Sequence, residues 1–375
     1  MSHKDNYKNT RKGKKSQGVK SEISILYRYK RYFLDLLSSR YLEIAKGDSD
    51  VDFQRWAVKV YDCFNFFQAG IFSHGIQKIF KAQTCQDRLC PACNHRRSLR
   101  TFAKLIQVVK NEKMQKYRYL HIVLTVRNCE PDKLKKTIDE LLYSFKKFLF
   151  NKRIKAINKG FFRSLEITYN EAEKTFHPHL HILLAVNPSY FTDTRKYSSY
   201  ADFTAIWQSS AALDYMPQVS VQALKPGDYA GIAEVAKYAV KESEQLLENI
   251  STMDLKILRL NLFQRRLIST GGIIRKIANE MKLNLSDDNS LTDNISDDDI
   301  KDETLKFIVE FLYNRKKKKY EIIEKEKPDF WFFRALKITA ATRLHLRTGG
   351  GGNTVTAGGV CMASYGGRIA NPHKI

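Results

Sequence analysis

Three histidines are clustered in one short stretch of this sequence, where they could bind a metal ion. Residues 175–184 read TFHPHLHILL and contain His177, His179 and His181, out of 9 histidines in the chain. Successive side chains of a β-strand point to opposite faces, so these imidazoles are predicted to share one face while Leu180 and Ile182 point the other way, into a core. Two imidazoles on one strand face can bind a single divalent ion. The alternative is a strand that carries its histidines by chance.

A second group of metal-binding residue types lies upstream. Cys85, Cys90 and Cys93 are close in sequence, and the last two have the two-residue spacing of a zinc knuckle. Cys63 is the candidate fourth thiolate of a tetrahedral, structural Zn²⁺ site, and His95 is the competing ligand. Free buried cysteines are the alternative interpretation.

Three arginines follow the knuckle directly. Arg96, Arg97 and Arg100 enter a predicted helix beside the cysteines, where their positive charges could contact phosphate groups. A solvated helix face is the alternative.

A possible nucleophile lies on a helix predicted over residues 229–247. Glu234 and Tyr238 are four residues apart, and Tyr238 and Lys241 are three apart, so all three would share one helix face. The phenol could act as a nucleophile, the carboxylate as its acid/base neighbour, and Lys237 or Lys241 as a cation that holds phosphate. From spacing alone, a solvated helix surface is the alternative.

The elements that position these residues are strands and amphipathic helices. The histidine stretch is predicted to pair as a hairpin with a strand over residues 161–169, across a polar turn. Glu166 lies in that strand, where it could reach the histidine face and complete a three-ligand set for Mg²⁺ or Mn²⁺. An exposed Glu on a half-buried strand is the alternative. Further strands are predicted at residues 117–128 and 219–223, and helices at residues 22–46, 131–158, 199–213 and 229–247.

Composition divides the chain into six predicted segments. The two ends and the linker are polar, with little to bury. The segments are a disordered basic arm (1–20), an N-terminal helical and Cys-rich zinc segment (21–110), a central domain (111–284), an acidic linker (285–304), a small C-terminal helical segment (305–348) and a Gly-rich flexible tail (349–375).

The overall charge favours a polyanionic partner. The 375 residues contain 64 Lys and Arg against 40 Asp and Glu, a formal net charge of +24. Neutralising nucleic-acid phosphates releases counterions, which favours such a pairing; a merely soluble basic protein is the alternative. The sequence contains no run of about 18 apolar residues, so no membrane span is expected. The polar N-terminus does not resemble a secretory signal. The cysteines are therefore expected in a reducing cytoplasm.

Four blocks resemble, in order across roughly residues 60–275, the motifs of the rolling-circle plasmid replication initiators of the His-hydrophobic-His (HUH) endonuclease superfamily. The combination is more specific than any single block. The blocks are the zinc-knuckle-like segment 85–97, Leu124-Thr125-Val126 with Asn128, the metal motif 177–184, and Glu234-x-x-x-Tyr238-x-x-Lys241.

The resemblance implies an α+β fold, a central antiparallel sheet flanked by helices, with residues 111–284 as the endonuclease domain. It implies metal ligands at His179 and His181, with Glu166 as the candidate third. Attack by Tyr238 would leave a 5′-phosphotyrosine and free a 3′-OH for a polymerase, and Glu234 would activate the water that ends the cycle.

By the same resemblance, the substrate is plasmid origin DNA, single-stranded or extruded as a hairpin so that the strand can reach the site. Host helicase and polymerase are the expected partners. One alternative is the same chemistry in a single-Tyr transposase; a relaxase is disfavoured because relaxases place the Tyr ahead of the His cluster. An alternative of another class is a non-catalytic, zinc-dependent DNA-binding regulator.

Overall fold

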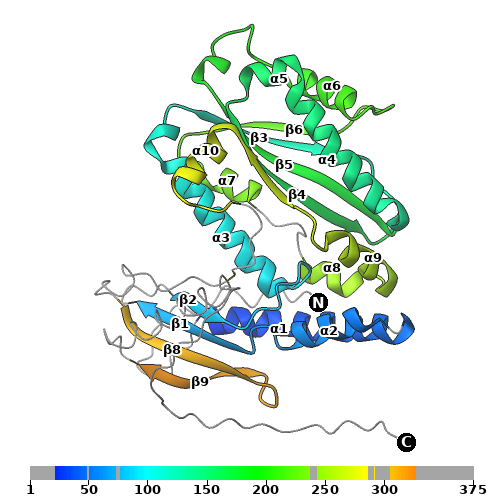
Figure 1. The fold of residues 1–375 in the computed structure, drawn as a ribbon, viewed down its shortest axis with the longest axis vertical. Helices are drawn as coiled ribbons and strands as arrows, with labels where there is room; N and C mark the ends of the chain where they lie inside the picture. The colour runs from blue at the N-terminus through cyan, green and yellow to red at the C-terminus, as the bar shows by residue number, and fades with distance from the viewer. Residues whose placement is uncertain are drawn as a thin grey trace, which may run out of the picture. The chain divides into compact units, whose positions relative to one another are not determined.

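The histidine strand lies in the middle of an antiparallel sheet (Figure 1). The structure is a computed structural model, and it describes residues 22–48, 50–72, 77–236, 243–285, 291 and 305–326. These residues all belong to the first of two compact units, residues 1–328, and the second unit, residues 329–375, lies outside the described part. A central antiparallel sheet with helices around it confirms the predicted α+β class.

The central sheet has five strands, and each neighbouring pair is antiparallel. The strands β4 and β5 form the predicted hairpin, in which Glu166 lies directly opposite His179. Because cross-strand partners share a face, this register places Glu166 on the histidine side of the sheet. The order across the sheet is β6 (Val219–Leu224), β3 (Arg118–Thr125), β5 (Thr175–Val186), β4 (Gly160–Asn170) and β7 (Ile268–Gly271).

Helices contact both faces of this sheet. On the face away from the histidines, Phe145 of α4 (Leu134–Phe150) packs edge-on against Phe161 of β4, with ring centroids 5.3 Å apart. On the histidine face, α7 (Tyr229–Val235) contacts β3 and β5. The Ser164 hydroxyl, on the same face as Glu166, donates a 2.7 Å hydrogen bond to the backbone oxygen of Val235 and so attaches the end of α7 to β4.

The long helix predicted at residues 131–158 is divided in two. After α4, Asn151 leaves the helical conformation and its side chain accepts a hydrogen bond from the backbone N–H of Arg153. Asn151 thereby caps the next helix, α5 (Lys152–Ile157). The apolar periodicity runs through this break, so the periodicity alone indicated one helix.

The helix predicted at residues 229–247 is also interrupted. α7 ends at Val235 with Ala236 as its C-cap, and α8 begins at Ser243 and ends at Asn249. Residues 237–242 lie outside the described part of the chain. Of the helix face expected for Glu234, Tyr238 and Lys241, the structure therefore describes only Glu234, on α7.

A second sheet, which the sequence analysis did not predict, joins the two ends of the described chain. Its order is β2 (Gln77–Ala82), β1 (Phe66–Phe72), β8 (Leu305–Asn314) and β9 (Lys319–Glu326). The helical prediction for the segment 305–348 is therefore wrong over residues 305–326, which form a β-hairpin. A short apolar run is compatible with the helix period and with the strand period alike. Here the segment forms a strand because β8 pairs with β1.

The remaining helices surround the two sheets. α1 (Glu22–Asp48) confirms the predicted leading helix and contacts α2, α3, α8 and α9. No helix in the described ranges is long and apolar enough to cross a membrane. The other helices are α2 (Val51–Tyr61), α3 (Pro91–Lys110), α6 (Tyr200–Ser210), α9 (Thr252–Leu262) and α10 (Gly272–Glu280), with 3-10 turns at Glu112–Met114, Pro131–Lys133 and Pro188–Tyr190.

The predicted domain boundaries remain predictions, since residues 1–328 cluster as one compact unit. The basic arm, the Gly-rich tail and most of the acidic linker lie outside the described residues. Leu291, inside the expected linker, is nevertheless only 2% exposed and belongs to the hydrophobic core.

Candidate metal centres

Glu166, His179 and His181 meet on one face of the central sheet. The Oε2 atom of Glu166 lies 3.4 Å from Nε2 of His179 and 2.7 Å from Nε2 of His181. All three side chains are buried, and their candidate ligand atoms lie within 4.8 Å of one another. One carboxylate and two imidazoles at this spacing can bind a single divalent ion.

The second nitrogen of each imidazole has a partner that orients the ring. Nδ1 of His181 lies 3.2 Å from Nε2 of His121, and Nδ1 of His179 lies 3.1 Å from the backbone oxygen of His177. When the proton is on Nδ1, the Nε2 lone pair of each ring faces Glu166. Metal-binding histidines are commonly oriented in this way by a hydrogen bond at the other nitrogen.

His121 is a residue that the sequence analysis missed. It lies buried on β3 and shares a sheet face with Thr125, the cross-strand partner of His179. The signal that could have found it is the two-residue alternation of the strand predicted at 117–128, which places His121 and Thr125 on the same side.

Two buried polar atoms test whether a metal ion fits this group. Oε1 of Glu166 has no hydrogen-bond partner among the described residues, and Nε2 of His181 has the Glu166 Oε2 atom beside it at 2.7 Å. A buried polar atom without a partner costs free energy, and a cation bound here would satisfy the Oε1 atom. Burial raises the pKa of Glu166, but His179 and His181 together outweigh it and lower that pKa to about 2, so the carboxylate is ionised. The donor set therefore fits a divalent metal ion.

His177 lies beside this group but is not part of it. Its ring centroid is 5.1 Å from that of His179. Burial and the neighbouring His179 lower the pKa of His177, which favours the neutral imidazole. Its ring nitrogens are not among the mutually close ligand atoms of Glu166, His179 and His181.

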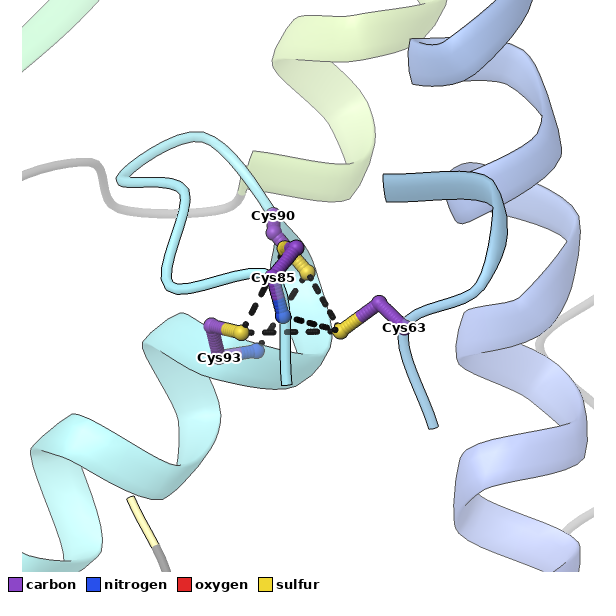
Figure 2. Close-up of side chains that lie close together, drawn as sticks. All are labelled: Cys63, Cys85, Cys90 and Cys93. Carbon is purple, nitrogen blue, oxygen red and sulfur yellow. Dashed lines mark hydrogen bonds between the residues drawn. The ribbon is translucent and has the colours of Figure 1, made fainter. Parts of the chain in front are cut away.

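The four cysteines that the sequence indicated form a second group (Figure 2). The Sγ–Sγ distance is 3.6 Å for each of the pairs Cys63–Cys90, Cys63–Cys93 and Cys85–Cys93. The edge of a zinc–thiolate tetrahedron is about 3.8 Å for Zn–S bonds of about 2.3 Å. The spacing therefore fits one tetrahedral ion, and Cys63 occupies the fourth position for which His95 was the competitor.

Three separate segments bring these sulfur atoms together. Cys63 follows α2, Cys85 lies in the loop after β2, and Cys90 and Cys93 begin α3. The sulfur of Cys90 caps α3 by accepting from the backbone N–H of Cys93, and that of Cys63 accepts from the N–H of Cys85 at 3.4 Å. Burial raises the pKa of the Cys63, Cys85 and Cys90 thiols. A bound cation would stabilise them as thiolates and link the three segments.

Arg96 and Arg97 were predicted to contact phosphate, but both are buried and hydrogen-bonded inside the protein. They are only 8% and 5% exposed. Arg97 donates from Nη1 to the Asp87 backbone oxygen at 3.0 Å and from Nη2 to the Gln86 backbone oxygen at 2.6 Å. These bonds hold in place the loop of residues 83–90 between β2 and α3, which we call the knuckle loop. Arg96 donates from Nε to the backbone oxygen of Leu291 at 3.1 Å. Arg100 is only partly buried, and its contact with DNA stays a prediction.

Of the predicted catalytic residues, the structure describes only Glu234. It lies on α7, whose last residue, Val235, accepts a hydrogen bond from the Ser164 hydroxyl. Ser164 is in turn the cross-strand partner of His181. Tyr238 and its neighbours Lys237 and Lys241 lie outside the described residues. The structure thus places the end of α7 next to the strands that carry the metal group.

Comparison with known proteins points to one family. The family model described as replication protein matches residues 76–321. This match extends past residue 275, where the motif resemblance ended, and includes β8. No solved structure matches the chain.

Several curated relatives agree with that match. A "Protein rep" of Streptococcus pneumoniae serotype 2 is 30% identical over 257 residues, which cover 67% of this chain and 79% of the relative. A "Protein rep" of Lentilactobacillus hilgardii is 32% identical over 273 residues, or 69% of this chain and 86% of the relative. A "Protein rep" of Staphylococcus aureus is 34% identical over 180 residues, or 47% and 78%.

Proposed function

The chain belongs to the replication protein family of plasmid replication initiators, and we propose that it nicks and rejoins one DNA strand at its plasmid's double-strand origin. The proposed reaction depends on a divalent metal ion and passes through a 5′-phosphotyrosine. It would start and end rolling-circle replication.

The observation that carries this proposal is the group formed by Glu166, His179 and His181. A phenol with a pKa of about 10 is a poor nucleophile at neutral pH. A Mg²⁺ or Mn²⁺ ion held by this group would polarise the scissile phosphate and stabilise its developing charge. The buried Glu166 Oε1 atom, which has no hydrogen-bond partner among the described residues, supports a cation at this position.

The attachment of α7 supports Tyr238 as the nucleophile. The backbone oxygen of Val235, the last residue of α7, accepts a hydrogen bond from Ser164, which lies across from His181 in the sheet. Tyr238 follows Val235 by three residues, a length of chain that spans at most about 11 Å. Together with the length of a tyrosine side chain, this keeps the phenol within reach of a phosphate at the metal group.

The proposed chemistry exchanges one phosphodiester bond for another. The Tyr238 hydroxyl gives up its proton as its oxygen attacks the scissile phosphorus, the bond from phosphorus to the 3′-oxygen breaks, and the leaving 3′-oxygen takes up a proton, so no proton is gained or lost overall. The product strand ends in a 3′-OH that a host polymerase can extend, after a host helicase has opened the duplex. Lys241 would hold the phosphate. Glu234 would remove a proton from the water that cleaves at the end of the cycle, when Tyr238 is already occupied.

The cysteine group has a structural role in this proposal. Cys63, Cys85, Cys90 and Cys93 would bind one Zn²⁺ ion and link α2, the knuckle loop and α3. Since all four positions are filled by thiolates, no site remains open for a substrate, which is typical of structural zinc.

The test uses the purified full chain, supercoiled plasmid carrying the origin, and Mg²⁺ or Mn²⁺. Wild type should nick the plasmid and remain covalently attached to the 5′ end after denaturing electrophoresis. Tyr238→Phe should form no adduct, while Tyr229→Phe, a matched change on exposed α7 surface, should behave as wild type. Glu234→Ala should still form the adduct, and when host polymerase and helicase are added it should accumulate DNA longer than one plasmid unit.

Two results would contradict the proposal. An adduct formed by Tyr238→Phe would mean that another residue is the nucleophile. Metal-independent origin binding without any cleavage would instead favour the DNA-binding regulator.

A further inference from the structure

We propose that a pocket beside the cysteine group binds one unpaired nucleotide of the DNA strand, at a distance from the metal group that performs the cleavage. The pocket has a volume of about 470 Å³, within the range of small-ligand sites. Three segments form it: α2, the knuckle loop, and the end of α9 with the residues after it. It shares Cys85 with the cysteine group and no residue with Glu166, His179 and His181. This inference rests on the proposed function, because it assumes a DNA substrate.

Two aromatic side chains line the pocket. Trp56 of α2 and Phe263, just after α9, have ring centroids 5.4 Å apart. Phe263 is 46% exposed, so a base in the pocket can reach its ring. Exposed rings next to positive charge are what single-stranded DNA sites provide, since a base of any sequence can stack on them.

A buried arginine forms the polar wall. Arg259 is 4% exposed, and its guanidinium carbon lies 3.8 Å from the centre of the Trp56 ring. Its Nε donates to Asp87 at 2.6 Å, which holds the guanidinium in place against the Trp56 ring.

The charge of the pocket favours an anion. Lys59, Arg88 and Arg259 line it, whereas Asp87 is the only carboxylate among the lining residues. Asp87 is already neutralised by Arg259, and it accepts a further hydrogen bond from Tyr41. Exposed Lys59 can therefore contact the phosphate while the base lies against Phe263. A base within a duplex is stacked on both faces, so only an unpaired nucleotide can enter.

Photo-crosslinking would locate the base. The probe is a single-stranded oligothymidylate with one 5-iodouracil, bound to the full chain without added Mg²⁺ or Mn²⁺ so that no cleavage occurs. Irradiation couples iodouracil to a nearby aromatic ring. Mass spectrometry should find the crosslink on the peptide with Trp56 or on that with Phe263. Crosslinks found only on other peptides would overturn the proposal.

Affinity measurements with the same probe supply the second readout. Phe263→Ala should raise the Kd for the single strand at least about fivefold, the lower end of one base stack. Phe150→Ala, which removes a 77% exposed ring at the end of α4, should leave Kd unchanged. Lys59→Ala should reduce the slope of log Kd against log salt by about 0.7, the value for one phosphate of a single strand.

Two outcomes separate this inference from the proposed function. If Phe263→Ala weakens a duplex of the same sequence as much as the single strand, the pocket is not a base site and the inference fails. If Phe263→Ala binds the single strand normally while Tyr238→Phe abolishes the adduct, the inference fails and the proposed cleavage stands. Because the binding assay needs no cleavage, loss of nicking activity cannot produce a false positive in it.

Discussion

Asp87→Asn should destabilise the region around the knuckle strongly. Asp87 is 5% exposed, and its carboxylate accepts from Arg259 Nε at 2.6 Å, from the Tyr41 hydroxyl at 3.1 Å and from the Leu89 N–H at 2.8 Å. An asparagine removes the negative charge and leaves the Arg259 cation buried without a counterion. Breaking a buried ion pair in this way costs about 3–5 kcal/mol.

The expected shift in melting temperature follows from the size of the unit. With an unfolding entropy of about 2.1 cal/mol/K per residue over the 328-residue unit, the loss corresponds to a fall in Tm of about 4–7 °C. Urea and thermal unfolding, followed by circular dichroism at neutral pH with zinc present, would measure both quantities.

A matched control separates burial from ion pairing as such. Asp139 also pairs with an arginine, Arg265, but its side chain is 54% exposed, so Asp139→Asn should cost at most about 1 kcal/mol. Replacing both buried partners, with Arg259→Met added to Asp87→Asn, should recover much of the lost stability, since no unpaired charge is left. The reasoning is refuted if Asp87→Asn costs no more than Asp139→Asn.

Three further predictions concern the two metal groups. Elemental analysis should find one zinc per chain, and Cys90→Ser or a strong chelator should lower Tm, whereas an unchanged Tm would argue against structural zinc. In chelated protein, the low pKa of Glu166 means that its stabilising effect is complete above the ordinary pKa of 4.5 and is lost as the pH falls through about 2. Acid titration of the unfolding free energy should show this loss in wild type and not in Glu166→Gln. His121→Ala should weaken Mn²⁺ binding about 10–100-fold by calorimetry while zinc content stays the same, because His121 orients His181; equal affinity would remove that role.

Local spacing was sufficient to predict both metal groups. The two-residue period of a strand puts His179 and His181 on one face whatever the rest of the chain does, and a short polar turn makes the preceding strand the natural partner. The spacing of Cys90 and Cys93 likewise belongs to one helix start. Cys63 could only be a candidate, because it lies 22 residues before Cys85 and approaches it only after β1 and β2 have paired between them.

Other features depended on contacts that local pattern does not encode. Arg96 and Arg97 are cations next to a zinc knuckle, which predicts an exposed basic face, yet backbone oxygens of the folded knuckle loop and of Leu291 bind them in the interior. His121 is an ordinary strand residue until β3 pairs with β5 and brings it to His181.

The residue types, the period of the histidine strand and the order of the motifs are properties of the chain, so the candidate metal ligands and the family resemblance could be found without a structure. The sheet that joins β1 to β8 became apparent only in the folded chain, where Phe66 pairs with Leu312 from a distant part of the sequence. The reason is physical. A strand or helix period repeats over a few residues and can be read locally, whereas pairing between distant segments depends on burial and hydrogen bonds that exist only once the chain has folded.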